Sequence, residues 1–206
     1  LLTDSRKLLF PATTAFFALG GPRRNGDAFV GELYQKGVRV FIVDEQFPVQ
    51  QAEPCMGANF LCVADVLGAL QDIAAYHRGQ FSIPVIGITG SNGKTMVKEW
   101  LWQLLQDDYQ VVRSPRSYNS QVGVPLSVWE MNESHTLAIF EAGISQPGEM
   151  ERLQKVIQPT IGVFTSIGEA HDEGFSGKEQ KVNEKAKLFT GAEVLIYGAD
   201  DPLLNR

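Results

Sequence analysis

The chain has few of the residues that build disulfide frameworks and zinc sites. Its 206 residues include only 2 cysteines, Cys55 and Cys62, and only 3 histidines. The spacing of the cysteines is not that of a metal-binding knuckle, so a reducing, cytoplasmic environment is the simpler interpretation. We expect both thiols to be ordinary packed or surface side chains.

Long apolar runs and an excess of positive charge are also missing. No run approaches the roughly 20 apolar residues that a membrane-spanning helix needs. The 18 basic residues are outnumbered by 24 acidic ones, which gives a net charge of −6. This balance argues against general binding to nucleic acid or to an anionic membrane surface. We expect no nucleic-acid partner and no membrane insertion. We expect instead a globular α/β chain of one or two domains.

The hydrophobic pattern divides the chain into two regions. Residues 1–81 read as a small α/β domain, with a strand at 38–43 and a helix from about 65 to 78. Residues 82–206 alternate strands with helices, which predicts a parallel sheet covered on both faces. The strands are expected at 83–88, 109–113, 136–140, 161–165 and 193–197, and the helices at 95–106, 147–157 and 177–190. Ligands of such sheets sit at the carboxyl ends of the strands.

The most informative segment joins the first of these strands to the first helix. Its residues are Thr89, Gly90, Ser91, Asn92, Gly93, Lys94 and Thr95. Glycines let backbone amides face an anion, and the helix N-terminus adds the positive end of its dipole. Lys94 would meet the β- and γ-phosphates of ATP, and the Thr95 hydroxyl would hold Mg²⁺. Ile88 stands where the common P-loop has its first glycine, so an ordinary strand–turn–helix connection remains the alternative.

Polar residues follow the later strands at the same predicted edge. Glu141 ends an apolar strand, where a carboxylate is well placed to bind Mg²⁺; the alternative is a solvated acid at the strand end. His171 lies in a polar strand-end loop and is either a cation ligand or an exposed side chain. The polar loop after the second strand, 114–125, is placed for substrate or nucleotide contact. The helix at 177–190 is rich in lysine, which by composition alone indicates a solvated cationic face.

These motifs together resemble the Mur ligase family, whose members are ATP-dependent enzymes of peptidoglycan precursor synthesis. Residues 89–95 resemble the family's TGTNGKT loop. Ser117 and Asn119, with Gly123 and Pro125 after them, resemble its Ser-x-Asn…Gly-x-Pro segment. The Glu-Ala-Gly-Ile-Ser segment that begins at Glu141, and the Gly-x-Ala-His segment that ends at His171, also have counterparts. The resemblance covers nearly the whole chain.

The resemblance implies roles for individual residues. Lys185 aligns with the family's carbamylated lysine, whose carbamate supplies an oxygen ligand to a second Mg²⁺. The implied metal ligands are therefore Thr95, Glu141, His171 and Lys185. The implied catalytic residues are Lys94, His171 and Lys185. The implied substrate-binding residues are Ser5, Arg6, Ser117, Asn119 and Ser120.

The first region is similar to the UDP-binding domain of the branch that adds D-Ala-D-Ala. Asp4-Ser5-Arg6 carries this similarity, although the family's Asp-Gly-His is Asn25-Gly26-Asp27 here. The resemblance implies UDP-MurNAc-tripeptide and D-Ala-D-Ala as substrates and an acyl phosphate as intermediate. It also implies a third domain, needed for closure over the site and located beyond residue 206. In a Bacteroidetes-type form an alanine racemase would follow. These 206 residues alone are then expected to be inactive as a ligase.

Other interpretations stay open at the level of sequence. A P-loop kinase or switch NTPase would explain Lys94, Thr95 and Glu141, but not the loop at 114–125 or the loop that carries His171. A sister ligase of the same family would add a different amino acid. A domain that kept the fold and lost the activity would not need the intact Gly-Lys-Thr.

Overall fold

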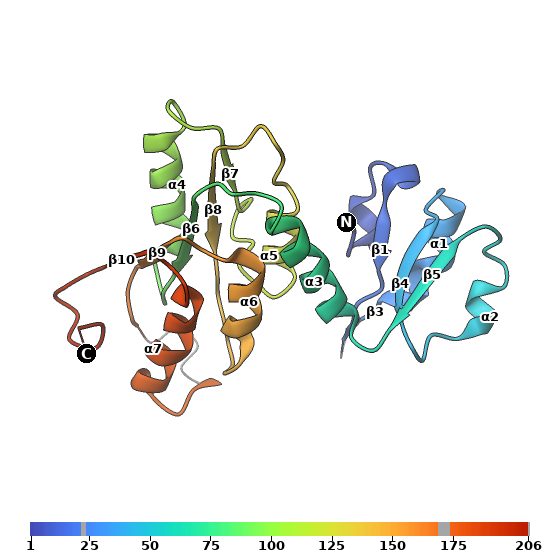
Figure 1. Ribbon diagram of the computed structural model, residues 1–206. Coiled ribbons are helices and arrows are strands. Elements are labelled where there is room, and N and C mark those ends of the chain that lie inside the picture. The colour runs from blue at the N-terminus through green and yellow to red at the C-terminus, as the bar shows by residue number, and fades with distance from the viewer. Residues whose placement is uncertain (22–23, 169–173, 206) are drawn as a thin grey trace. The chain divides into compact units, whose positions relative to one another are not determined.

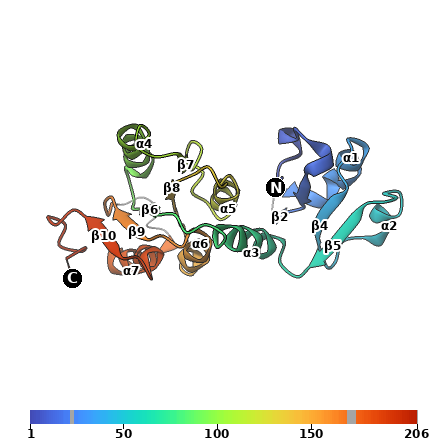
Figure 2. The same ribbon diagram turned by 45° about the horizontal axis from the view of Figure 1, so that its top comes forward.

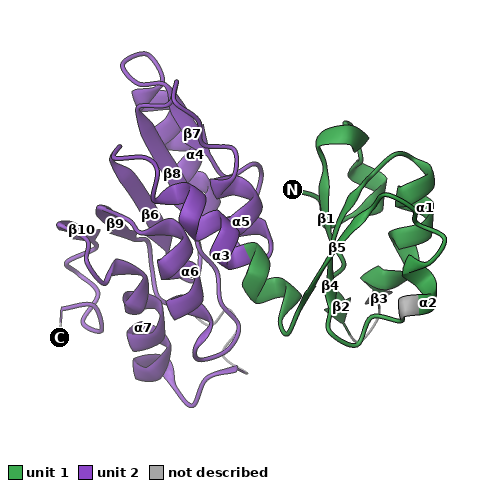
Figure 3. Ribbon diagram, turned by 45° about the vertical axis from the view of Figure 1, so that its right-hand side comes forward, with its two compact units in different colours: residues 1–70 green, residues 71–206 purple. Residues whose placement is uncertain are grey.

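The computed structural model describes residues 1–21, 24–168 and 174–205 (Figure 1, and from a second direction in Figure 2). Contacts between residues divide the chain into two compact units, residues 1–70 and 71–206 (Figure 3). The sequence placed the boundary later, between 81 and 82. Most of helix α3 (Val66–Arg78) falls in the second unit, where Ala74 packs into the core and Arg78 donates hydrogen bonds to the carbonyls of Ile157 and Gln158, at 2.9 and 3.0 Å.

The first unit is built on a small parallel sheet in the order β1-β4-β5. Its strands are β1 (Ala15–Phe17), β4 (Val40–Asp44) and β5 (Asn59–Val63), and β2 (Gly20–Gly21) pairs with β3 (Arg24–Asn25). Helices α1 (Val30–Gln35) and α2 (Val49–Ala52) and 3-10 turns at Ser5–Lys7, Pro11–Thr13 and Gly26–Phe29 complete the unit. Phe41 of β4 is buried and stacks on Phe60 with 5.2 Å between ring centroids. The apolar run at 38–43 therefore forms the centre of this core.

The second unit contains a five-stranded parallel sheet in the order β10-β9-β6-β8-β7. Its strands are β6 (Val85–Thr89), β7 (Val111–Arg113), β8 (Leu137–Glu141), β9 (Ile161–Phe164) and β10 (Val194–Tyr197). Its helices are α4 (Lys94–Leu105), α5 (Gly123–Val128), α6 (Glu149–Ile157) and α7 (Lys178–Ala186), and the last continues as a 3-10 turn at Lys187–Phe189. Each strand predicted in this region is present within about two residues of its expected bounds, a shift typical of element ends.

Both faces of this sheet are covered, as the alternation of strands and helices predicted. Figure 2 shows α4 on one side of the sheet and α6 and α7 on the other. Because side chains alternate along a strand, Val85 of β6 enters the larger core with Leu153 of α6, whereas Ile86 and Ile88 pack toward Leu101 of α4. The sheet thus holds the carboxyl ends of β6, β7, β8 and β9 at one edge.

One helix of the second unit was missed by the sequence analysis, which interpreted residues 114–125 as loop; α2 of the first unit was not predicted either. Helix α5 begins at Gly123 and carries Pro125 in its first turn, where proline's missing amide breaks no helical hydrogen bond. Val124 and Val128 are fully buried against the core of the second unit. Tertiary burial, rather than helix propensity, therefore decides the conformation here.

In the part of the chain that the structure describes, no helix has the length and apolar character to cross a membrane.

We predict that Gly162→Ala destabilises the second unit by about 1–3 kcal/mol, because overpacking of a core carries that cost. A Cβ at residue 162 of β9 would lie 2.4 Å from Cδ1 of the buried Phe189 ring. Urea unfolding followed by tryptophan fluorescence measures the change, since all 3 tryptophans lie in the second unit. Gly177→Ala is the control: its extended backbone and open surroundings predict a change within about 0.5 kcal/mol. Equal stability of the two variants would contradict the prediction.

Candidate phosphate and metal site

The segment 90–93 leaves the end of β6 in a conformation that requires glycine. Gly90 has φ +143° and Gly93 has φ +80°, and both values lie in the region that side chains disfavour. A Cβ at residue 90 would also lie 2.1 Å from Thr165 Oγ1, far inside contact distance. The backbone of this loop therefore passes against the segment that follows β9 at a distance that only glycine allows.

Hydrogen bonds from the segment after β9 fix the loop. The Ser91 amide donates to the carbonyl of Ser166 at 2.8 Å, and the Thr165 hydroxyl donates to the carbonyl of Asn92 at 2.6 Å. Helix α4 begins directly after the loop, so its free N-terminal amides and the positive end of its dipole face this edge of the sheet. The loop is thus a rigid cradle with the polarity that an anion needs.

Three lysine ammonium groups converge on this loop. Lys94 donates to the carbonyls of Gly90 and Ser91, at 2.9 and 3.3 Å. Lys185 of α7 reaches the Gly90 carbonyl at 3.4 Å, and Lys181 reaches the Gly168 carbonyl at 2.5 Å. Composition alone makes the lysines of this helix a solvated face, yet Lys181 is fully buried and Lys185 is 2% exposed. The interior side of α7 therefore carries two buried ammonium groups, together with the buried carboxylate of Glu184, which pairs with Lys187 at 2.7 Å.

Burial and mutual repulsion change the acidity of this cluster. Burial, together with the smaller effect of the nearby charges of Lys94 and Lys181, lowers the pKa of Lys185 to about 8. Burial also lowers the pKa of Lys94, although the carboxylate of Glu141 opposes this shift. Positive charge concentrated at a glycine-rich loop is the electrostatic condition for holding phosphate groups.

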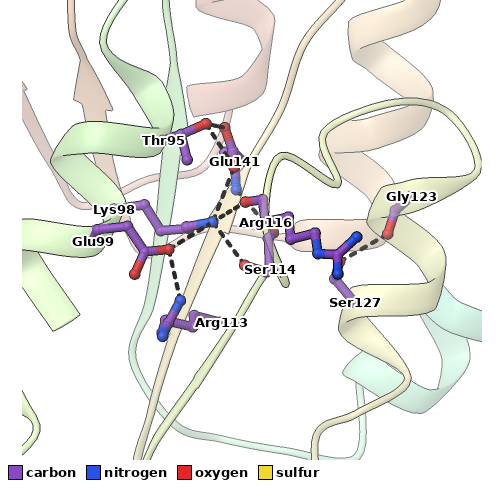
Figure 4. A network of polar contacts seen from close by, with 9 residues as sticks. All are labelled: Thr95, Lys98, Glu99, Arg113, Ser114, Arg116, Gly123, Ser127 and Glu141. Carbon is purple, nitrogen blue, oxygen red and sulfur yellow. Dashed lines mark hydrogen bonds and ion pairs between the residues drawn. The ribbon is translucent and has the colours of Figure 1, made fainter.

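Thr95 and Glu141 bring two oxygen ligands together beside the loop (Figure 4). The Thr95 hydroxyl donates to Glu141 Oε2 at 2.9 Å, and Oε1 lies 3.2 Å from the same hydroxyl. Glu141 is the last residue of β8 and is fully buried. Carboxylate and hydroxyl oxygens are the donors that Mg²⁺ prefers, with phosphate oxygens and waters completing its shell. The two side chains therefore fit a magnesium ion held together with a phosphate.

The sequence analysis missed Lys98, which lies in the same network. Its ammonium group is fully buried and contacts Glu141 Oε1 at 3.1 Å and the carbonyl of Ser114 at 2.8 Å. One signal was available, because Lys98 lies one helical turn after Lys94, on a helix whose inner positions, such as Val97 and Leu101, are apolar. A lysine so close to the apolar face calls for a buried partner.

A pocket of about 290 Å³ opens next to the cradle. Four of its lining residues were singled out from the sequence: Lys94, Asn119, Ser120 and Lys185. The sequence analysis assigned no role to Gln121 or Glu149, which also line it, and Ser117 is exposed outside the lining. The structure therefore brings the loop after β7 and helix α7 to one cavity. His171 lies outside the described residues.

The first unit holds a separate pocket of about 630 Å³. Asp27, Asp44 and Asp65 line it, and burial raises the pKa of Asp27, whose Oδ1 has no hydrogen-bond partner among the described residues. Ser5 and Arg6 do not line this pocket. Ser5 is buried in a 3-10 turn, and Arg6 pairs with Asp4 at 2.7 Å. The substrate-binding role of these two residues stays a prediction.

No group of three or more histidine, cysteine or acidic side chains that could hold a metal ion occurs in residues 1–21, 24–168 and 174–205. Among those residues, Thr95 and Glu141 bring side-chain oxygen atoms together at this edge, where phosphate oxygens could complete the shell of a metal. The parallel sheet, the glycine-rich strand–turn–helix and the acid at the next strand end define a P-loop-type α/β domain.

Comparison with known proteins agrees with this class. The model of the Mur ligase middle domain matches residues 88–206. The UDP-N-acetylmuramoyl-tripeptide–D-alanyl-D-alanine ligases of Bacillus subtilis and Treponema pallidum are 34% and 36% identical over 98% and 85% of this chain. A crystal structure of MurF from Acinetobacter baumannii matches with a TM-score of 0.87 at 31% identity, over 98% of this chain. The chain belongs to the Mur ligase family.

A second solved structure, the MurF ligase of Thermotoga maritima in complex with ADP, covers 99% of this chain with a TM-score of 0.86 at 26% identity. The chain spans less than half the length of these relatives, 44% and 39% of the two curated proteins and 43% and 46% of the two solved chains. Because the two solved structures match 98% and 99% of this chain, the structural similarity extends over both units described above.

We predict that Lys185→Met raises stability near neutral pH in buffer freed of carbon dioxide. The pKa of Lys185 is about 8 in the folded chain against an ordinary value of 10.5. The unfolded state therefore binds more protons between these values, and the free energy of unfolding rises as the pH rises through that window. Removal of the amine makes the variant more stable than the parent at about pH 7 and reduces the rise.

Urea unfolding at several pH values between about 7 and 11 measures this difference. Lys178→Met, at an exposed lysine on the same helix, is the matched control and should follow the parent. A parent whose stability does not rise with pH, or a Lys185→Met variant that rises as steeply as the parent, would contradict the prediction.

Proposed function

We propose that this chain is the nucleotide-binding part of an ATP-dependent amide-bond ligase that adds D-Ala-D-Ala to UDP-MurNAc-tripeptide in peptidoglycan precursor synthesis. Two kinds of observation support the proposal. The curated relatives named above are ligases of this kind, and one solved relative is a complex with ADP. The observation that carries the proposal is the convergence of the 90–93 loop, Lys94 and the Thr95–Glu141 pair at one sheet edge. A cytoplasmic location belongs to the same proposal.

In this proposal the loop 89–95 holds the phosphates of ATP. Backbone amides of the loop and of the α4 N-terminus donate hydrogen bonds to the phosphate oxygens. Lys94 turns from the carbonyls of its own loop toward the β- and γ-phosphates. Thr95 and Glu141 would hold Mg²⁺, whose charge would offset that of the phosphoryl group. His171 and a carbamylated Lys185 are proposed as further metal ligands.

The chemistry proceeds in two steps, a phosphoryl transfer and an acyl transfer. The terminal carboxylate of UDP-MurNAc-tripeptide attacks the γ-phosphorus of ATP, so ADP leaves and an acyl phosphate forms. The amine of D-Ala-D-Ala then attacks the acyl carbon, loses a proton, and expels phosphate as the amide bond forms. Lys94 stabilises the transferring phosphoryl group by electrostatic positioning rather than by covalent chemistry. Asn119 and Ser120, which line the pocket beside Lys94, are assigned to the substrate.

The alternatives use less of the observed geometry. A P-loop kinase or NTPase needs the loop, Thr95 and Glu141, but gives no role to the pocket that joins Asn119 to Lys185. Another Mur-family ligase would share the nucleotide site and differ in the amino acid that it adds. Closure by a further domain, which excludes water from the acyl phosphate, is part of the proposal for the whole enzyme.

We predict that Lys94→Ala weakens the binding of Mg²⁺-ATP to this chain by about 10- to 100-fold, the range for loss of a charge-assisted hydrogen bond. Isothermal titration calorimetry of the chain with Mg²⁺-ATP measures the dissociation constant. Lys155→Ala removes an exposed lysine at the end of α6 in the same unit and should bind like the parent. Equal affinities for parent and Lys94→Ala would contradict the nucleotide site.

The substrate part is tested separately by titrating UDP-MurNAc-tripeptide into the same chain with Mg²⁺-ATP present. The proposal expects binding of the tripeptide-linked nucleotide and none of UDP-glucose at the same concentration. Binding of ATP without binding of UDP-MurNAc-tripeptide would favour the kinase or NTPase alternative.

A further inference from the structure

One buried ammonium group joins two segments of the candidate site. Lys98 of α4 is fully buried, and its Nζ contacts oxygen atoms of four neighbours, one of which is the carboxylate of Glu99 at 3.2 Å (Figure 4). It donates to Glu141 Oε1 at 3.1 Å, to the carbonyl of Ser114 at 2.8 Å and to the carbonyl of Arg116. An ammonium group has three protons, so these three hydrogen bonds use its full donor capacity, and Glu99 adds an ion-pair contact.

The two carbonyls belong to the loop that lines the pocket. Ser114 directly follows β7, and Arg116 has φ +51°, a left-handed conformation that a residue with a side chain adopts at a cost. The Lys98 ammonium group donates to the carbonyl of this residue. Three residues later, the Asn119 carbonyl accepts the Gly143 amide at 2.8 Å, which ties the loop to the segment after β8.

The third contact sets the orientation of the Glu141 carboxylate. Lys98 engages Oε1, whereas Oε2 makes the shorter contact with the Thr95 hydroxyl, at 2.9 Å. Side-chain rotation of Glu141 would therefore break an ion pair in a fully buried site, where an unpaired charge is costly. Oε2 is thereby held next to the other oxygen ligand.

We propose that Lys98 is a positioning residue that holds the Glu141 carboxylate and the 114–120 loop as one unit, so that metal and substrate sites form together. The inference rests on the proposed function, in which Glu141 and Thr95 hold Mg²⁺. Lys98 itself touches neither ATP nor substrate in this account. Partners that orient a metal ligand are typically worth about 10- to 100-fold in metal affinity.

Lys98→Met tests the proposal because methionine has a similar length and no donor. ATP affinity is measured by calorimetry with Mg²⁺ and with EDTA, and the ratio of the two constants gives the tightening due to the metal. We expect Lys98→Met to reduce this ratio by about 10- to 100-fold. Affinity in EDTA should stay within about twofold, because the phosphate loop is untouched. A role confined to fold stability would leave the ratio unchanged.

Glu99→Gln is the matched control on the neighbouring residue. It removes the negative charge that pairs with Lys98 and Arg113, at 3.2 and 2.6 Å, and leaves the Lys98–Glu141 pair in place. Its metal-dependent ratio should equal that of the parent. A ratio that falls equally in Glu99→Gln and Lys98→Met would contradict a specific role for the Glu141 contact.

Amide hydrogen exchange gives a readout that needs no nucleotide. The Gly143 amide, which donates to the Asn119 carbonyl, should exchange faster in Lys98→Met and at the parent rate in Glu99→Gln. A parent without metal-dependent tightening would overturn the proposed function, while the exchange rates still decide whether Lys98 anchors the loop. If Lys98→Met does not fold, Lys98→Gln keeps an uncharged donor and should show the same direction of change. Unchanged ratio and exchange in a folded variant would overturn the inference.

Discussion

The close approach between Gly90 and Thr165 is the constraint on which the rest of the site depends. A loop that turns at the end of β6 can lie against the segment after β9 only if residue 90 has no side chain. That contact fixes the direction in which α4 begins, and with it the positions of Lys94 and Thr95. The parallel sheet supplies the second half of the arrangement, because it places the end of β8, with Glu141, at the same edge.

Charge burial on both sides of the loop follows from this geometry. On one side, Lys98 and Glu141 are both fully buried and neutralise each other in an ion pair at 3.1 Å. On the other side, Lys181 and Lys185 are buried with Lys94 nearby, and burial lowers the pKa of Lys185 to about 8. The first group forms an ion pair, and the second concentrates positive charge beside the glycine-rich loop, which favours an anion. The Lys98–Glu141 pair therefore stabilises the structure of the site, whereas the lysines of α7 provide positive charge suited to phosphate.

The sequence predicted the parts that depend on local pattern and on a motif. The glycine-rich segment, the acid at residue 141 and the alternating strands are local signals, and the structure brings Lys94, Thr95 and Glu141 together as expected. Lys98 was not predicted, because its partners at 114, 116 and 141 are set by tertiary packing. Helix α5 was missed for the same reason. The glycine and proline within it indicate a loop in the sequence, whereas the burial of Val124 in the folded chain favours the helix.

A structure of the chain with Mg²⁺ and a non-hydrolysable ATP analogue tests the central claim most directly. The account predicts phosphates against the amides of residues 90–95, with Lys94 turned from the Gly90 carbonyl to a phosphate oxygen. It also predicts Mg²⁺ on Thr95 and Glu141, with Lys98 still paired to the carboxylate. A nucleotide bound elsewhere, or bound here with Lys94 still on the Gly90 carbonyl and no metal at Glu141, would contradict the account.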